Sequence, residues 1–582
     1  MCAIGDSRVR PGPPSDWCLT RSCGLCTDPS MTNSIRTVVG IVVLLLSARP
    51  AAAKVVQPFP EGFLWGVAIS GFQNDMGQGA PNDENSDWWV WVRDPDNIAT
   101  GKVSGDLPED GPGFYKFYGK AARQARRLGA NAFRMSIEWS RIFPTSTAGV
   151  DISGGFTPAV LAELGALADQ DEVAHYRAVF TELRKRRLEP MVTLTHFTLP
   201  LWLHDPIAIR DAFASVNPFT GPVPPGLTQS GWLDEAIVDE LAKYSAYAGF
   251  AFGDLVDSWA PINEPIIVIT EGYLNIAGVG GFYPPGVASF AAVLASMDPL
   301  LTGHARAYDA LHATDTTDAS GDGTAAVVGL VHHMVAVDPF NPAVPGDVVS
   351  AANFDYLFNR VALTALTSGA FDANLDGDTT DPGEERSDLE GRTDYVGVNY
   401  YRRAVVISLG VPISPLIPLF DFLPVLDYAT PENPGGLPCP SECNDMGWEI
   451  FPQGLRRLLT FVGTLGVPVI ITENGIPDSA DEKRAQFIFD HLSVLQEAID
   501  DGLADVRGYL HWTLTDDFEW TSGYFPEFGL REFDTATAKE RRRKGARPFK
   551  SIAHHNGITG SLIRKLGSPS AAFLDATTGV LD

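Results

Sequence analysis

The sequence predicts an α/β chain folded as a (β/α)8 TIM barrel with extended loops. Two observations carry this prediction: eight short apolar runs, and segments between them with the periodicity of amphipathic helices. Strands that alternate with helices form parallel βαβ units, and eight such units can close a barrel. The alternative is an open doubly wound sheet, but no GxGxxG turn follows the first run and no Walker sequence is present.

The expected strands are rich in β-branched and aromatic residues, which favour extended structure. In chain order they are FLWGVAIS from Phe63, AFRMSIEW from Ala132, PMVTLTHF from Pro190, LVDSWAPI from Leu255, AAVVGLVHHMV from Ala325, DYVGVNYY from Asp394, PVIITEN from Pro468 and VRGYLHWTL from Val506. Between them, segments such as Phe117–Leu128 and Tyr176–Arg187 repeat apolar residues at three- and four-residue spacing and carry cationic outer faces. This pattern is typical of helices that surround a barrel.

Composition and charge exclude several classes of protein. The 582-residue chain is 45% hydrophobic and 20% charged, which excludes collagen-like, coiled-coil and wholly disordered chains. Its formal net charge of −29 disfavours a phosphate backbone or an anionic membrane surface as partner. We therefore expect no nucleic-acid partner, and no membrane partner once the N-terminal segment is removed.

Residues 31–53 have the pattern of a secretory signal peptide. Arg36 lies in a short polar start, an apolar run follows over residues 38–46, and small residues precede Lys54. The apolar run is too short to span a bilayer. The alternative, a buried helix, has no capping residue and is followed by Pro50.

The expected organisation therefore has three parts. Residues 1–30 lie upstream of a complete signal and are expected to be an over-extended start, residues 31–53 are the signal, and residues 54–582 form one exported domain, periplasmic or extracellular. Only Cys439 and Cys443 lie after residue 30. In an exported protein this pair can close a small disulfide loop, and free thiols are the alternative.

Polar and aromatic residues crowd the carboxyl ends of the expected strands, where a parallel barrel places its chemistry. They are Gln73, Arg134, His196, Asn263, Glu264, Asn399, Tyr401, Glu473, Trp512, Glu519 and Trp520. Glu264 follows the fourth strand and Glu473 the seventh, so the two carboxylates would face each other across the barrel mouth. Opposed carboxylates suit cleavage of a glycosidic bond, in which one protonates the leaving oxygen and the other attacks or activates water.

Each of these signals has a structural alternative when taken singly. Asn-Glu-Pro can be only a helix start, with Pro265 in the first helical position, and Asn474-Gly475 can be only a turn. Trp512 and His196 can be ordinary interior residues. The joint placement of these residues on the correct strands favours the catalytic interpretation.

Seven motifs together resemble glycoside hydrolase family 1, the family of retaining β-glucosidases and β-galactosidases. In chain order they are FLWGVAISGFQ, FRMSIEWSRIFP, LTHFTLPLWL, WAPINEP, VGVNYY, VIITENG and HWTLTDDFEWTSGYFPEFGL, spread over Phe59 to Ile558. The resemblance implies that Glu264 is the acid/base and Glu473 the nucleophile. It also implies that Arg134 holds Glu473 ionised and that Tyr401 orients it.

The resemblance assigns the sugar site as well. Asn263 would bind the sugar 2-hydroxyl, Trp512 would form the stacking floor, and the other expected sugar-binding residues are Gln73, His196, Asn399, Glu519 and Trp520. A carboxylate at Glu519 would repel the phosphate of a 6-phosphorylated sugar. Because the two glutamates need different protonation states, we expect Arg134 to lower the pKa of Glu473 and a less charged surrounding to raise that of Glu264.

The sequence thus predicts a retaining exo-β-glycosidase that needs no cofactor for its chemistry. Glucose is the first expectation for the sugar, and galactose and fucose stay open, as does the oligomeric state. The alternatives are a transglycosidase on the same scaffold and a carbohydrate-binding barrel that has lost catalysis. The second alternative predicts damage among the catalytic residues, and none is damaged.

A loop between the fifth and sixth strands resembles a calcium loop. Asp372, Asn374, Asp376 and Asp378 place oxygen side chains at alternate positions around Gly377. A full EF-hand would carry Glu where Gly383 stands. The two interpretations are a structural calcium site, which would order the loop, and a solvated acidic loop.

Overall fold

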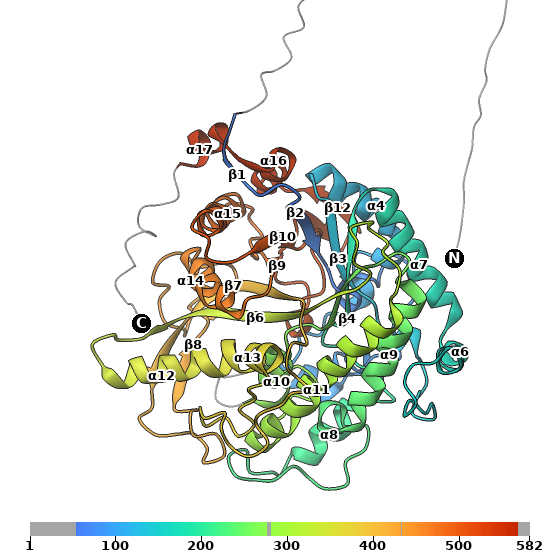
Figure 1. Ribbon diagram of the computed structural model, residues 1–582. Coiled ribbons are helices and arrows are strands. Elements are labelled where there is room, and N and C mark those ends of the chain that lie inside the picture. Colours follow the sequence, from blue (N-terminus) through green and yellow to red (C-terminus); the bar gives the residue numbers. More distant parts are fainter. Residues whose placement is uncertain (1–53, 276–280, 432, 568–582) are drawn as a thin grey trace, which may run out of the picture. The chain divides into compact units, whose positions relative to one another are not determined.

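Eight parallel strands close into a barrel, which confirms the (β/α)8 prediction (Figure 1). The computed structural model describes residues 54–275, 281–431 and 433–567, so residues 1–30 and the expected signal peptide over residues 31–53 lie outside the described residues. The sheet closes because β6 pairs with β5 on one side and with β7 on the other. The barrel strands are β2 (Leu64–Ala68), β3 (Ala132–Ser136), β4 (Glu189–Thr195), β5 (Ser258–Ile262), β6 (Val327–Pro339), β7 (Tyr395–Ser408), β9 (Val469–Asn474) and β10 (Val506–Trp512).

Helices connect successive barrel strands and cover the outside of the sheet (Figure 1). The main ones are α4 (Phe114–Leu128), α7 (Gln170–Lys185), α9 (Ala236–Phe252), α11 (Phe290–Thr314), α12 (Pro345–Asp355), α13 (Val361–Ser368), α14 (Gln453–Val462), α15 (Arg484–Asp500) and α16 (Arg547–His555). The loops carry the shorter helices α1 (Gly71–Asn74), α2 (Asp87–Trp91), α3 (Pro95–Ala99), α5 (Trp139–Ile142), α6 (Pro158–Leu167), α8 (Pro206–Phe213), α10 (Pro265–Tyr273) and α17 (Gly560–Leu566).

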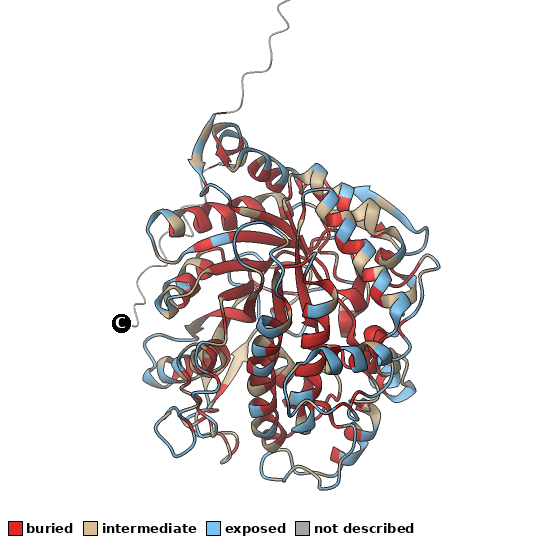
Figure 2. Cartoon of the chain, turned by 45° about the vertical axis from the view of Figure 1, so that its right-hand side comes forward, coloured by how far each residue is buried: buried red, intermediate tan, exposed pale blue. Residues whose placement is uncertain are grey.

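The barrel strands are buried almost along their whole length (Figure 2). The side chains of Phe133 and Val192, for example, are buried. Parallel strands with helices on one side and a filled interior on the other are buried on both faces. This burial explains why the strands are recognisable in the sequence as continuous apolar runs.

Two strands run further than the sequence predicts. β6 and β7 stay paired beyond the barrel as far as Pro339 and Val406, and β8 (Phe422–Val425) adds an antiparallel strand to the end of β7. Buried and partly exposed residues alternate in this extension of β7, because the strand has left the barrel core. Two small antiparallel pairs, β1 (Val55–Pro58) with β13 (Gly557–Thr559) and β11 (Arg531–Asp534) with β12 (Lys539–Arg542), complete the strands.

The two helices expected over residues 117–128 and 176–187 are present as α4 and α7. α7 ends two residues before the predicted boundary, since Arg187 has a left-handed φ of 57°. Cys439 and Cys443 form a disulfide with an S–S distance of 2.01 Å, which decides between the two states left open by the sequence. Within the described ranges, no helix combines the length and apolar character needed to cross a bilayer.

Candidate active site

Glu264 lies directly after β5, at the mouth of the barrel. Its backbone is left-handed, with φ 49° and ψ 65°, and Pro265 follows as the first residue of α10. A left-handed conformation costs a residue with a side chain about 1 to 3 kcal/mol, so the surrounding structure must hold it in place. The backbone N–H of Glu264 donates to the carbonyl of Val331 on β6 (2.9 Å). Glu264 is therefore both the residue that precedes α10 and the carrier of a buried carboxylate, so the two interpretations of the Asn-Glu-Pro sequence hold together.

Glu473 lies on β9, and both of its carboxylate oxygens are bound. Oε1 forms an ion pair with the guanidinium of Arg134 on β3, and Oε2 accepts the hydroxyl hydrogen of Tyr401 on β7 (2.6 Å). Burial, with the charges of Glu473 and Glu264, raises the pKa of Tyr401 well above its usual value, so the phenol stays protonated and donates. The structure thus brings together the three residues that the sequence grouped around the expected nucleophile.

One hydrogen-bond network joins the two glutamates. Arg134 Nη2 donates to Asn263 Oδ1 (2.6 Å), next to Glu264 in the chain. Asn399 Nδ2 donates to Glu264 Oε1 (2.6 Å), and its Oδ1 accepts from Thr472 Oγ1 (2.6 Å). These residues come from β3, β7 and β9 and from the residue that follows β5, so four barrel strands set the relative position of the two carboxylates.

His333 on β6 also contacts Glu264, and sequence reasoning missed it. Its Nδ1 lies 3.3 Å from Glu264 Oε1, and its ring lies nearly parallel to that of Tyr401 with centroids 5.8 Å apart. The signal was the HHM sequence inside the fifth apolar run, the one run to which no site residue was assigned. Nothing in one apolar run shows which of two adjacent histidines faces the barrel interior.

The pKa directions of the two glutamates are opposite to those expected. Burial raises the pKa of Glu473 to about 7 in spite of Arg134, and the charge of Glu264 adds to the rise. Burial also opposes ionisation of Glu264, but the positive charge of His333 and the hydrogen bonds from His333 and Asn399 outweigh it and lower the pKa of Glu264. Two carboxylates that share a buried site hold one proton between them over a range of pH. The difference between the two pKa values therefore has the opposite sign to the one that attack by Glu473 and protonation by Glu264 require, so the proton that the pair shares must lie on Glu264 when the substrate is attacked.

The polar end of the expected sugar site contains Gln73 and Glu519. Gln73 Nε2 donates to Glu519 Oε2 (3.1 Å), and Gln73 Oε1 accepts from Ser70 Oγ (2.7 Å). Burial and the charges of Asp517 and Glu473 raise the pKa of Glu519 well above its usual value. The structure therefore brings Gln73 and Glu519 into contact, and their binding of sugar hydroxyls stays a prediction.

Three rings line another side of the site. His196 lies between Trp512 and Trp520, with centroid distances of 5.8 and 5.9 Å and nearly parallel planes. Burial and the charge of Arg134 keep the pKa of His196 well below its usual value, so its imidazole is neutral. Its Nε2 lies 3.3 Å from Asn263 Nδ2, which can only donate, so Nε2 accepts and Nδ1 carries the hydrogen.

Two further aromatic residues that the sequence did not single out lie near the site. Tyr283 packs against Trp520 (5.8 Å between centroids), and Trp448 packs against Tyr401 (5.8 Å). Both belong to long connections rather than to strand ends, so the rule that located the other residues could not find them.

The expected calcium loop is held by its own hydrogen bonds. Asp372 is buried and accepts the backbone N–H groups of Asp376 (3.1 Å) and Gly377 (2.8 Å), and Asn374 donates to Asp376 (3.1 Å). Asp378 is exposed and accepts from Thr380. Across the described part of the chain, no three His, Cys, Asp or Glu residues are arranged to hold a metal ion. Calcium binding at this loop stays a prediction.

Comparison with known proteins finds relatives that match this chain over nearly their whole length. The beta-galactosidase of Pyrococcus woesei is 40% identical over 527 residues, which cover 87% of this chain and 99% of that protein. The beta-glucosidase A of Thermotoga maritima is 25% identical over 521 residues, with coverage of 86% and 99%. The crystal structure of the beta-glycosidase from Thermosphaera aggregans superposes with a TM-score of 0.74 at 32% identity and covers 88% of this chain and 99% of that one.

The match to a family profile covers the whole barrel. The profile described as Glycosyl hydrolase family 1 matches residues 55–209 and 221–558, which include every residue of the network between the two glutamates. The relatives matched over nearly their whole length, the superposable crystal structure and this profile all indicate the same family. The chain belongs to glycosyl hydrolase family 1.

Proposed function

We propose that this glycoside hydrolase removes terminal β-D-glucosyl and β-D-galactosyl residues from the non-reducing ends of small glycosides. The similarity to proteins named beta-galactosidase and beta-glucosidase supports both sugars. The observation that carries the proposal is the buried pair of glutamates joined by one network, each with different partners. By family, the enzyme acts with retention of the anomeric configuration, through a covalent glycosyl-enzyme.

In the first step Glu473 attacks the anomeric carbon and Glu264 protonates the leaving oxygen. Arg134 and Tyr401 hold the two oxygens of Glu473 in place, so the attacking group is oriented before substrate arrives. His333 and Asn399 both contact Oε1 of Glu264. Among the described residues none is hydrogen-bonded to Oε2, so Oε2 is the oxygen that delivers the proton.

In the second step Glu264 takes a proton from water, and the resulting hydroxyl group replaces Glu473 on the sugar. Esterification removes the charge of Glu473, and with it the repulsion that disfavours ionisation of Glu264. The lowering of the pKa of Glu264 by His333 and Asn399 assists the same change. The acid of the first step thereby becomes the base of the second.

The remaining residues divide between sugar binding and positioning. Asn263 Nδ2 keeps one hydrogen for a sugar hydroxyl, and the ring of His196, with its Nε2 3.3 Å from that nitrogen, borders the same position. Gln73, Glu519 and Trp520 bind the hydroxyl groups that lie away from the anomeric carbon, and Trp512 covers one face of the sugar ring. Asn399 has both ends of its amide bound by protein, so its role is to position Glu264.

The test combines a panel of substrates with product stereochemistry. Nitrophenyl β-glucoside, β-galactoside and β-fucoside are compared with their α-anomers, and proton NMR follows the first product formed. We expect β-glucoside and β-galactoside to be cleaved and the β-anomer to appear first. Appearance of the α-anomer first would overturn the retaining mechanism, and cleavage limited to α-glycosides would overturn the function. A Glu264→Gln/Glu473→Gln double variant measures the contaminating activity.

A further inference from the structure

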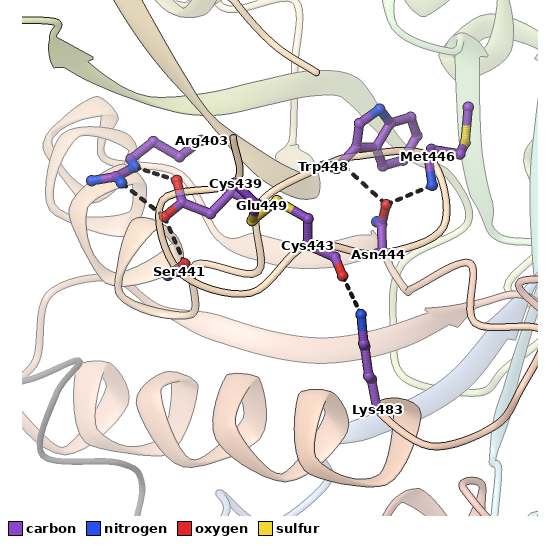
Figure 3. The surroundings of a disulfide bond; sticks show 9 residues. All are labelled: Arg403, Cys439, Ser441, Cys443, Asn444, Met446, Trp448, Glu449 and Lys483. Carbon is purple, nitrogen blue, oxygen red and sulfur yellow. Dashed lines mark hydrogen bonds and ion pairs between the residues drawn. A yellow bond between two sulfur atoms is a disulfide. The ribbon is translucent and has the colours of Figure 1, made fainter. Parts of the chain in front are cut away.

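The turn over residues 439–450, here called the disulfide turn, carries Trp448 (Figure 3). The ring of Trp448 packs against that of Tyr401 in the active site. The Cys439–Cys443 bond closes it on one side, and Cys443 pairs with Glu449 in an antiparallel bridge. Asn444 Oδ1 accepts the backbone N–H groups of Met446 and Trp448, each at 3.0 Å. Asn444 N also donates to the carbonyl of Trp448 (3.0 Å). The backbone of Trp448 is therefore bound to the residue that directly follows the disulfide.

The disulfide turn is anchored to the strand that carries Tyr401. Glu449 accepts two hydrogen bonds from Arg403 on β7, each 2.8 Å long, and a third from Ser441 Oγ (2.8 Å). Arg403 follows Tyr401 by two residues, so the same strand fixes the turn and the partner of the nucleophile. A paired, bidentate contact of this kind restrains orientation as well as distance.

The disulfide turn is also anchored to the segment that follows the nucleophile strand β9. Lys483 donates to the carbonyl of Cys443, and Asp445 accepts the backbone N–H of Ser479 (2.7 Å). The turn is therefore tied both to β7, which carries Tyr401, and to the segment that follows β9, which carries Glu473.

Trp448 differs from the rings around it in its exposure. Tyr401 and Phe528 are buried, and Trp448, which packs against them with centroids 5.8 and 6.0 Å away, is partly exposed. The guanidinium of Arg402 lies 4.8 Å from its ring centroid and forms an ion pair with Asp427. A partly exposed indole next to the nucleophile's partner is suited to contact the portion of a substrate that lies beyond the buried sugar.

We propose that the Cys439–Cys443 disulfide is a positioning element that fixes Trp448 as a wall of the site for the leaving group and for the accepting alcohol or sugar. The inference rests on the proposed function, in which the glycosyl-enzyme on Glu473 is attacked from that side. The bond excludes alternative conformations of the disulfide turn, so less ordering is required when an acceptor binds. The sugar-binding residues lie outside the turn and do not depend on it.

The main experiment replaces the disulfide and measures transfer separately from hydrolysis. Cys439→Ser/Cys443→Ser is compared with the wild type, with Trp448→Ala, and with Leu437→Ala as a control at an exposed position of the same connection. Dinitrophenyl β-glucoside is the donor, and methyl β-glucoside is the added acceptor. We expect the transfer-to-hydrolysis ratio to fall, and KM for cellobiose to rise, by about two- to tenfold in the double variant, from the loss of an ordered aromatic contact. kcat for the dinitrophenyl substrate should stay unchanged.

A second pair of variants leaves the disulfide intact. Asn444→Ala removes the acceptor of the Trp448 N–H group and should reproduce the fall in transfer, whereas Asn444→Asp keeps an acceptor oxygen and should restore it. This pair keeps the inference testable if the double serine variant fails to fold. Combining Trp448→Ala with the double serine change should add little, because both act through one contact.

The contrary outcomes are distinct. A wild-type transfer ratio in the double serine variant, with a reduced ratio in Trp448→Ala, would show that the disulfide positions nothing. A wild-type ratio in Trp448→Ala would remove Trp448 from the acceptor site. Failure of the wild type itself to cleave any β-glycoside would overturn the proposed function, and with it the inference, whereas the two outcomes above overturn the inference alone.

Discussion

At the scale of single residues, the two glutamates are chemically alike and differ through their neighbours. Glu473 is held by a permanent cation and a phenol, whereas Glu264 is held by an amide and an imidazole. The permanent partner suits a group that must stay oriented for attack. Both partners of Glu264 contact Oε1, which leaves Oε2 for a group that must both give and accept a proton.

The division of labour between the glutamates predicts two different phenotypes. Glu473→Gly removes the attacking group, so hydrolysis should fall about a thousandfold or more, and formate should partly restore it by occupying the vacated space. Glu264→Ala should slow cellobiose by about 100- to 10,000-fold and dinitrophenyl β-glucoside far less, because a good leaving group needs little protonation. Steady-state kinetics with the two substrates provides the measurement. Exchanged phenotypes would reverse the roles, and circular dichroism of both variants controls for folding.

The contact between His333 and Glu264 predicts a shift in pH dependence. For the wild type, kcat/KM on methyl β-glucoside should decline as pH rises through about 7, when the shared proton is lost from the pair. His333→Asn removes a positive charge that lowers the pKa of Glu264, so the acid and alkaline limbs should both move to higher pH. His555→Asn, at an exposed position, should leave the profile unchanged. An unmoved profile in His333→Asn would show that this charge does not act on the pair.

At the scale of elements, the sequence predicted the barrel because burial on both faces makes each strand a mainly apolar run. The extensions of β6 and β7 were not predicted, since partly exposed charged residues such as Asp338, Arg402 and Arg403 interrupt the apolar runs there. The same limit applies to the site. Glu264 and Glu473 could be located from strand ends, but the pKa directions depend on burial and on His333, and neither is visible in a local sequence pattern.

The loop over residues 372–384 belongs to this scale, and its calcium prediction concerns stability. If calcium binds only the folded chain, a concentration one hundred times Kd should stabilise it by about 2.7 kcal/mol. Calorimetry of chelator-treated protein with and without calcium measures this, and Asp376→Ala should abolish the gain. Asp318→Ala serves as the control, because Asp318 also accepts backbone N–H groups in an exposed acidic loop. An unchanged melting temperature of the wild type on adding calcium would rule the site out. Hydrolysis rates should not respond, since the loop shares no contact with either catalytic glutamate among the described hydrogen bonds.

At the scale of the whole molecule, the described barrel supplies the site, and export is a property predicted from the sequence of the first 53 residues. Expression of the full chain in a secreting host should yield an exported protein that begins near Lys54, because small residues at Ala51 and Ala53 follow a short apolar core. N-terminal sequencing identifies the first residue. Replacing both alanines by leucine should leave a longer precursor. Recovery of exported protein that still carries residues 2–30 would contradict the prediction.

The network that joins the glutamates also constrains how such an enzyme can diversify over generations. Arg134 is shared by Glu473 and Asn263, and Asn399 is shared by Glu264, Asn263 and Thr472. A change at Arg134 or Asn399 disturbs several hydrogen-bond partners at once, so a single substitution there impairs more than one contact of the network. We therefore expect changes in substrate range to arise in parts of the chain outside this network. Connections such as the one that carries Trp448 are where lineages with the same two glutamates are free to diverge.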